Sequence, residues 1–345
     1  MKKRSIFISV LLSSLILVIF SCKKSTEQPN LIEQKVAMLA EGTTFDNLAF
    51  LASCKDGLEK ARIDFALDVE YNIDTISDQY LQRIDNYCQR DFDLIIAIGY
   101  MWNDAVMEAA TNNPEIRFIL VDSELSQTRD NVISILFDVD EAAFPLGFLS
   151  AWWADSQVAG TPVIGSVGAL EISQIRQFIE AFENGAEYYN ETYNRNVSSL
   201  HSYVGSFFDP ELGKQHAADL IEEGADVIFG VGSETGNGAL LKAKELEVQG
   251  IGVDVDQYFS CPEVSAILIS SAMKELGNAI YEVTSLFTKQ EFYGMGVYTG
   301  NLSNQGVGIA PYHDFENLIP DSIKTAVESI KTGIINGNIA TGWEE

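Results

Sequence analysis

The sequence predicts an α/β protein built from two open, mainly parallel β-sheets, each covered by helices on both faces. Three observations support this fold class. Short apolar runs alternate with longer amphipathic segments from residue 35 onward. The apolar runs are nearly continuous, as in LIIAIG (94–99), which is typical of strands buried on both faces. The segment 137–162, which we interpret as a crossover and a helix, separates two such halves, and 345 residues suffice for two domains.

The expected elements follow one another in a regular order. In the first half the strands are 35–40, 64–70, 94–99, 117–122 and 131–137, and the helices are 48–61, 77–90 and 103–112. In the second half the strands are 163–169, 199–205, 226–232 and 250–256, and the helices are 173–190, 210–223 and 238–246. A further strand at 265–273 and a helix at 274–287 would return the chain to the first half.

These elements define two lobes. We expect an N-terminal lobe from 35–138 plus 264–300, and a C-terminal lobe from 139–263 plus 301–345. Two sheets joined by several crossings form a cleft at the carboxyl ends of their strands, and ligands bind there in such sheets. Functional residues are therefore expected in the short segments that follow each strand.

The N-terminus predicts export. Residues 1–21 combine Lys2, Lys3 and Arg4 with a short apolar stretch, as a secretory signal peptide does, and the polar segment 22–34 reads as a tether. Cys22 directly after Ser21 fits a lipoprotein signal, in which acyl chains such as palmitate anchor the protein on the extracytoplasmic side of a membrane. An ordinary cleaved signal with an incidental cysteine is the alternative.

Charge and cysteine content exclude several classes of partner. The chain has 50 acidic and 22 basic residues and a net charge of −28. Such a surface repels nucleic acid and anionic lipid. The cysteines that remain after Cys22, which are Cys54, Cys88 and Cys261, have irregular spacing and predict neither a disulfide framework nor a metal site.

The segment DVIFGVGSETGNG (226–238) raises the question of phosphate binding. It differs from a dinucleotide-binding fingerprint because the third glycine is out of place, and Glu234 would oppose phosphate charge. No Lys-Ser/Thr pair follows, so it is not a Walker A motif. Two interpretations remain, a simple strand-to-helix turn or a loop that offers backbone groups and a helix N-terminus to a neutral polar ligand.

Other strand ends carry polar and aromatic side chains. Glu41, Asp122 and Asp254 each follow or end a strand, and Phe207 and Lys274 follow two others. A single acid there is often a helix cap, but three acids, a lysine and aromatic rings on one cleft suit sugar hydroxyls and a planar base. Catalysis and metal binding find little support, since no histidine lies beside a nucleophile in sequence. FDVDE (137–141) lacks the spacing of a calcium loop and reads as a solvated crossing segment.

At these residues the chain resembles the basic membrane protein lipoproteins, a family of ABC-transporter substrate-binding proteins whose best-understood members are purine nucleoside receptors. The resemblance covers nearly the whole mature chain. Its most specific segments are DVIFGVGSETGNG, IGVDVDQY (251–258), GSFFDPELGKQ (205–215) and SAMKELGNAIYE (271–282). It implies a type I periplasmic-binding-protein fold, in which two lobes joined by a three-stranded hinge enclose a nucleoside that passes to a permease and its ATPase.

The resemblance also implies ligand-binding roles. Phe50 and Phe207 would sandwich the base, and Asp122 would bond its edge. Asp254 and Lys274 would hold ribose hydroxyls. The pocket would be completed by Glu41, which stands where the family usually has aspartate, and by Gly232 and Ser233.

Departures from the family pattern fall in the same pocket. Leu51 stands where an asparagine is expected, and Ser233 and Glu234 replace paired glycines. A rebuilt pocket could bind a sugar or another small polar ligand, and a lipoprotein that senses without importing is a further alternative. An enzyme acting on nucleosides is disfavoured, and no cofactor is expected. Trp102 is a further aromatic that could stack on a ligand or pack within its lobe.

Overall fold

A computed structural model describes residues 34–42, 44–45, 49–74, 79–157, 160–293 and 296–344. The expected signal peptide, Cys22 and nearly all of the tether lie outside these residues. Within them, none of the helices combines the length and apolar character needed to cross a membrane.

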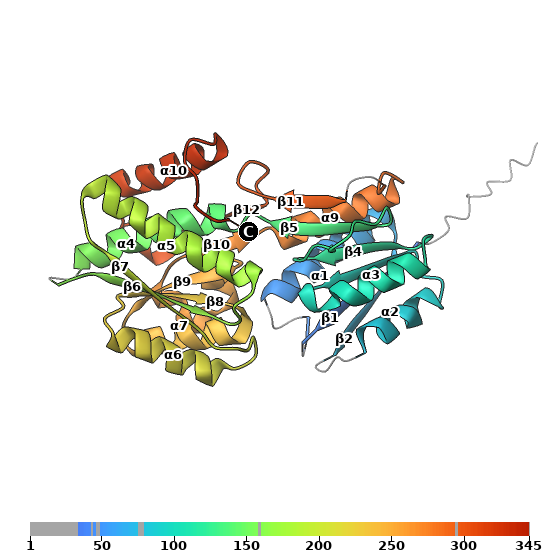
Figure 1. The fold of residues 1–345 in the computed structure, drawn as a ribbon, viewed down its shortest axis with the longest axis horizontal. Coiled ribbons are helices and arrows are strands. Elements are labelled where there is room, and N and C mark those ends of the chain that lie inside the picture. The colour runs from blue at the N-terminus through green and yellow to red at the C-terminus, as the bar shows by residue number, and fades with distance from the viewer. Residues whose placement is uncertain are drawn as a thin grey trace, which may run out of the picture. The chain divides into compact units, whose positions relative to one another are not determined.

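In the part of the chain that the structure describes, the first sheet has six strands in the order β11-β5-β4-β3-β1-β2, and every pair is parallel (Figure 1). Its strands are β1 (Lys35–Glu41), β2 (Asp68–Asp74), β3 (Leu94–Ile98), β4 (Arg117–Val121), β5 (Val132–Phe137) and β11 (Val297–Gly300). The helices between them are α1 (Ala49–Phe65), α2 (Tyr80–Cys88), α3 (Asn103–Asn112) and α9 (Leu276–Thr288), with a 3₁₀ turn η1 (Tyr100–Trp102).

The second sheet also has six strands, in the order β12-β10-β9-β8-β6-β7, and only the edge strand β12 is antiparallel. Its strands are β6 (Val163–Gly168), β7 (Ser198–Tyr203), β8 (Val227–Val231), β9 (Gln249–Asp254), β10 (Leu268–Lys274) and β12 (Val307–Ile309). The remaining helical elements are α4 (Asp140–Gln157), α5 (Ser173–Tyr193), α6 (Pro210–Glu222), α7 (Ser233–Glu245), α8 (Gln257–Ser260), η2 (Pro262–Ile267), η3 (His313–Phe315) and α10 (Asp321–Ile335).

Helices bury both faces of each sheet, which confirms the predicted fold class. On β1, Val36 and Met38 point to the core beneath α1 and α9, while Ala37 and Leu39 point to the core beneath α2 and α3. The second sheet is likewise enclosed, by α4 and α5 on one face and by α6 and α7 on the other. This double burial explains why β3 reads LIIAI without a polar residue.

The return crossing lies later in the chain than the sequence suggested. We expected residues 264–300 in the N-terminal lobe, but β10 pairs with β9 and β12 in the second sheet. The chain returns to the first sheet only after Lys274, where α9 packs against α1. Among the described residues, the chain therefore crosses between the sheets three times, after Phe137, after Lys274 and after Gly300.

The acidic segment at the first crossing is not solvated, contrary to expectation. Asp140 is only 8% exposed and accepts hydrogen bonds from the Gln177 amide at 2.7 Å and the Thr341 hydroxyl at 2.5 Å. Glu141 accepts a hydrogen bond at 2.7 Å from the backbone N–H of Leu302 in the third crossing. These carboxylates have a structural role, since they join the crossing segments to one another and to α5.

The pKa values at this crossing predict a pH-dependent stability. Burial, followed by the charge of Asp140, raises the pKa of Asp138, and burial also raises the pKa of Glu141. A carboxyl whose pKa is raised on folding binds more protons in the folded than in the unfolded chain between the two pKa values, so its contribution to stability falls as pH rises upward from about 4. The free energy of unfolding, measured with urea from pH 4 to pH 8, should decline less for Asp138→Asn than for the wild type.

The exposed acid Glu108 on α3 is the matched control for that experiment. Glu108→Gln should leave the decline as it is in the wild type. An Asp138→Asn curve with the wild-type slope would show that the crossing carboxyl does not contribute to it.

Candidate ligand-binding site

A cavity of about 120 Å³ is lined by residues that follow strands of both sheets. All eight residues proposed from the sequence line it, namely Glu41, Phe50, Asp122, Phe207, Gly232, Ser233, Asp254 and Lys274. They converge because the carboxyl ends of parallel strands share one edge of each sheet. The fold thus brings residues more than two hundred positions apart in the chain to one cavity.

A buried lysine between two carboxylates forms the charged centre of the cavity. The Lys274 ammonium, whose side chain is 4% exposed, lies 2.8 Å from an Asp122 oxygen and 3.6 Å from an Asp254 oxygen. Burial alone would lower the pKa of Lys274, but the two carboxylates outweigh it and the pKa is raised. Burial raises the pKa of Asp254, and the charge of Lys274 offsets this only in part.

Aromatic rings surround the ammonium. Lys274 Nζ lies 5.2 Å from the ring centre of Phe178, 5.5 Å from that of Phe50 and 5.8 Å from that of Phe137. Rings within about 6 Å of a cation attract it through their negative faces. The two carboxylates and these rings together therefore hold the ammonium charged within the cavity.

Three residues of the cavity adopt the left-handed backbone conformation, which is uncommon for residues other than glycine. The φ angles are +59° at Asp122, +50° at Ser233 and +67° at Asp254. At Asp254 the strand ends in a tight turn, closed by a 2.8 Å hydrogen bond from the Val255 N–H to the Val253 carbonyl. Such strain persists where the surroundings impose it and is concentrated at functional sites.

Glu41 contributes a second acidic position at the end of β1. One of its carboxylate oxygens accepts a hydrogen bond from the Tyr80 hydroxyl at 2.7 Å. A carboxylate held in this way retains further acceptor sites on its two oxygens. Glu41 is therefore suited to accept from N–H or O–H groups of a ligand.

The aromatic walls come from different sheets. Phe50 lies in the first turn of α1, whereas Phe207 and Phe208 follow β7. Phe207 and Phe208 pack at 6.5 Å with their planes 59° apart, and Phe208 is 46% exposed. Phe50 and Phe207 both line the cavity, so it has aromatic rings from two separate segments of the chain.

The glycine-rich loop is a helix N-terminus. The sequence predicted the helix from residue 238, but α7 begins at Ser233, directly after Gly232. Contacts to the neighbouring loop override the weak helix propensity of SETGNG, because the Thr235 hydroxyl donates to the Ser206 carbonyl at 2.7 Å and accepts from the Asp209 N–H at 3.1 Å. The positive end of α7 is thereby placed at the cavity wall.

Alanine at Gly232 is expected to damage both folding and binding. Gly232 has a φ of +111°, and a Cβ there would lie 2.4 Å from the Cβ of Ala169. We expect Gly232→Ala to lower the free energy of unfolding by about 2–4 kcal/mol and to weaken ligand binding because Ser233 shifts. Urea unfolding and calorimetry measure the two effects.

Gly308 on β12 provides the control, since a Cβ there would meet no atom within 4 Å. Gly308→Ala should remain within about 0.5 kcal/mol of the wild type. Equal stabilities for the Gly232→Ala and Gly308→Ala variants would contradict the close packing of the loop.

Trp102 packs within the core of the N-terminal lobe and does not line the cavity. It is fully buried, and its ring meets Tyr80 edge-on at 4.8 Å. From the same segment Tyr100 and Met101 line the cavity instead. The 3₁₀ turn η1 directs Trp102 into the core and leaves Tyr100 and Met101 at the cavity.

Sequence reasoning missed several other lining residues. Gln174 and Phe178 belong to α5, and the Gln174 amide donates to the Asp122 carbonyl at 3.3 Å. They lie within a helix, so the rule that strand ends carry the site could not find them. Leu51, the departure noted in the sequence, lines the cavity and is buried.

Comparisons with known proteins bear on the function of this cavity. The family model described as "ABC transporter substrate-binding protein PnrA-like" matches residues 33–342. Basic membrane protein A2 of Borrelia garinii subsp. bavariensis is 29% identical over 318 residues, which cover 90% of this chain and 89% of that protein. An uncharacterised lipoprotein of Pyrococcus abyssi is 27% identical and is matched over 82% of this chain and 70% of its own length.

Solved structures share the fold. A solute-binding protein of an ABC transporter system from Aeropyrum pernix superposes with a TM-score of 0.81 at 24% identity, covering 90% of this chain and 94% of that one. A second solute-binding protein, from Conexibacter woesei, gives a TM-score of 0.67 at 21% identity, covering 89% and 98% of the two chains.

Proposed function

Because this chain belongs to the PnrA-like family of ABC-transporter substrate-binding proteins, we propose that it captures a purine nucleoside in the cavity between its two sheets. One observation carries the proposal. A buried lysine with two carboxylates and a pair of aromatic walls converge on one cavity, which suits a ligand with both hydroxyl groups and a planar ring.

Each part of a nucleoside has a complementary group. Phe50 and Phe207 enclose the base, and stacking contributes roughly 1–3 kcal/mol per base on comparable aromatic platforms. Asp122 accepts from the base edge, and Asp254 and Lys274 hold ribose hydroxyls. Hydrogen bonds to charged groups contribute about 1.5–3 kcal/mol each. Glu41, Gly232 and Ser233 complete the enclosure.

The charge of the cavity favours a neutral ligand over a phosphorylated one. Among the described residues, its lining side chains include the carboxylates of Glu41, Asp122 and Asp254 but one ammonium, that of Lys274. A phosphate would meet excess negative charge in a partly desolvated site, which costs binding free energy. Nucleoside 5′-monophosphates are therefore expected to bind far more weakly than the corresponding nucleosides.

Membership of the family implies a small-molecule ligand and a permease that receives it. The proposed cellular arrangement is a lipoprotein held at the membrane through Cys22, on the extracytoplasmic side. Relatives named as lipoproteins support this anchor. Closure of the two domains over the ligand by a hinge motion would be the signal that the permease reads.

Isothermal calorimetry on the chain from Lys23 onward tests the proposal. The protein is unfolded and refolded to remove bound ligand, then titrated with guanosine, inosine, adenosine, cytidine, uridine, ribose and inosine 5′-monophosphate. We expect tight binding of at least one purine nucleoside, little response to the monophosphate, and no free base by chromatography. Release of base would indicate an enzyme.

A sugar is the second candidate ligand. Leu51 offers no polar contact beside Phe50, and the Asp254–Lys274 pair alone suits sugar hydroxyls. Ribose binding as tight as that of any nucleoside would select this candidate. Silence across the panel from a folded protein would reject the nucleoside proposal.

A further inference from the structure

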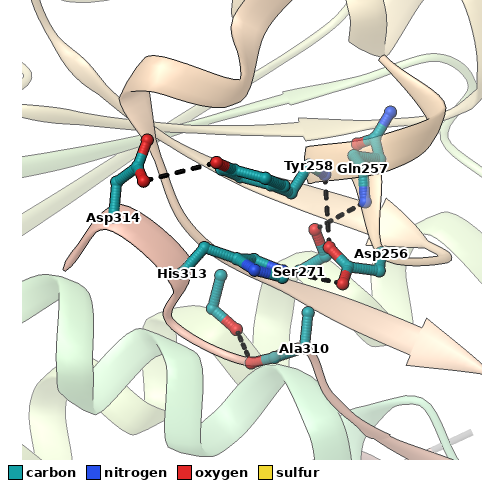
Figure 2. A network of polar contacts seen from close by, with 8 residues as sticks. Asp256, Gln257, Tyr258, Ser271, Ala310, His313 and Asp314 are labelled. Atoms are coloured by element: carbon teal, nitrogen blue, oxygen red, sulfur yellow. Dashed lines mark hydrogen bonds and ion pairs between the residues drawn. The ribbon is translucent and has the colours of Figure 1, made fainter. Parts of the chain in front are cut away.

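Gln257 is not among the residues that line the ligand cavity, but its side chain is hydrogen-bonded to Val253, which is. It is the first residue of α8, three positions after Asp254, and its side chain is buried, with the residue 4% exposed. Figure 2 shows it beside Asp256, Tyr258 and Ser271, at one side of the polar contacts around His313. A buried polar side chain of this kind must find its hydrogen bonds inside the protein.

Three hydrogen bonds connect Gln257 to three different segments. Its side-chain carbonyl accepts from the backbone N–H of Val253 on β9 at 2.8 Å. Its side-chain amide donates to Asn237 Oδ1 on α7 at 2.7 Å, and its backbone N–H donates to Ser271 Oγ on β10 at 3.2 Å.

Each of these partners lines the cavity or lies close in sequence to a residue that does. Val253 lines the cavity and precedes Asp254, Asn237 is one helical turn after Ser233, and Ser271 is three residues before Lys274. Gln257 therefore connects the three segments of the second sheet that present charged and polar groups to the ligand.

The bond to Val253 replaces a missing strand partner. The pairing of β8 with β9 ends at Phe229 and Ile251, so the Val253 N–H has no β8 residue opposite it. Gly252 leaves room for the side-chain carbonyl of Gln257, because a Cβ at position 252 would lie 2.7 Å from Gln257 Oε1. The Val253 carbonyl accepts from Val255. Both polar backbone groups of Val253 are thus bound by residues beyond Asp254, which keeps Asp254 at its φ of +67°.

A second set of contacts fixes the start of α8. Asp256 accepts from the Tyr258 N–H at 3.2 Å and lies 2.8 Å from His313 Nε2. The His313 ring stacks on Tyr258 at 4.0 Å, and the Tyr258 hydroxyl donates to Asp314 at 3.3 Å (Figure 2). These contacts hold α8 so that Gln257 points inward.

We propose that Gln257 is a positioning residue for ligand binding, which sets Asp254, Ser233 and Lys274 in one fixed geometry without touching the ligand. Groups held in a productive arrangement by surrounding hydrogen bonds bind more tightly than groups that must be ordered on binding. A purely structural role would change stability but would leave the selectivity of the folded protein as it is. Only a positioning role changes how the site discriminates between ligands.

The ligand-dependent test compares inosine with 2′-deoxyinosine and 3′-deoxyinosine, and it rests on the proposed function. In the wild type, loss of a ribose hydroxyl held by Asp254 or Lys274 should weaken binding at least about 10-fold. In Gln257→Met, inosine should bind at least about 10-fold more weakly, and the penalty for the missing hydroxyl should shrink to about 3-fold or less. A penalty equal to that of the wild type would overturn the proposal.

The matched control is Ser270→Ala. Ser270 is a buried residue next to Ser271 on β10. Its hydroxyl donates to the Ala310 carbonyl at 2.7 Å and not to Gln257. This variant also loses one buried hydrogen bond, but it should retain the wild-type penalty for the missing hydroxyl. Should Gln257→Met fail to fold, Asn237→Ala and Ser271→Ala each remove one of the three bonds and should reduce the penalty in the same direction. A wild-type penalty in both would overturn the proposal.

A ligand-free measurement separates this inference from the nucleoside proposal. Amide hydrogen exchange of Val253, followed by NMR, should be at least about 10-fold faster in Gln257→Met, while the amides of β6 and β8 keep their wild-type rates. If no nucleoside binds the wild type, the proposed function fails, but this measurement still decides the role of Gln257. Unchanged exchange at Val253 would show that Gln257 does not hold the end of β9.

Discussion

Replacement of Lys274 by methionine is expected to abolish ligand binding and to lower the free energy of unfolding by about 3–5 kcal/mol. The ammonium is buried between Asp122 and Asp254, at 2.8 Å and 3.6 Å. Its removal leaves two carboxylates facing each other in the cavity with no counter-charge. Urea unfolding and calorimetry on the refolded variant measure the two effects.

The pH dependence of this variant has a defined sign. Burial already raises the pKa of Asp254 in the presence of Lys274, and loss of the lysine raises it further. Because a raised carboxyl pKa favours the protonated folded state, the stability deficit of Lys274→Met should shrink as pH falls from 8 toward 5. Adding Asp254→Asn to Lys274→Met should recover part of the stability at pH 8. A deficit that grows on acidification would contradict the assigned charge arrangement.

Replacement of Asp254 by asparagine is expected to weaken nucleoside binding by about 100-fold while changing stability little. The carboxylate is the only acid at the end of β9 that faces both the cavity and Lys274 among the described residues. An amide of the same shape loses the charge-assisted bond to a ribose hydroxyl. Because burial raises the pKa of Asp254, its charge is costly in the folded chain, so neutralisation should not unfold the protein.

Asp226 is the matched control for that variant. It is another partly buried acid of the second sheet whose pKa burial raises, and its carboxylate accepts from the Val163 N–H at 3.1 Å. It precedes β8, at the opposite end of the strands from the cavity. Asp226→Asn should keep the wild-type affinity. Near-equal affinities for the two variants would reject the ribose assignment of Asp254.

Much of the fold could be predicted because double burial leaves a clear pattern. The run LIIAI of β3 and the run VIFGV of β8 are buried at every position, so the strands stand out from the amphipathic helices. Strand partners could not be predicted from the same pattern. The order of the elements favours the first lobe for the run at 265–273, whereas β10 pairs with β9 in the second sheet. Local hydrophobicity does not specify which of two parallel sheets receives a strand.

The cavity was predictable where its residues end strands and unpredictable where they do not. Glu41, Asp122 and Asp254 follow from the rule that ligands bind at strand carboxyl ends. Gln174 lies in a helix, and Gln257 is recognisable only from its bonds to Val253 and Asn237 in the folded chain. An acidic run such as the one around Asp140 predicts a solvated segment, but the fold supplies Gln177 and Thr341 as donors to its buried carboxylate.

A crystal structure of the refolded chain with inosine would test the nucleoside proposal most directly. We expect the purine ring between Phe50 and Phe207, an edge of the base at Asp122, and ribose hydroxyls within hydrogen-bond distance of Asp254 and Lys274. An empty cavity at saturating inosine, or inosine bound at another surface, would contradict the proposal.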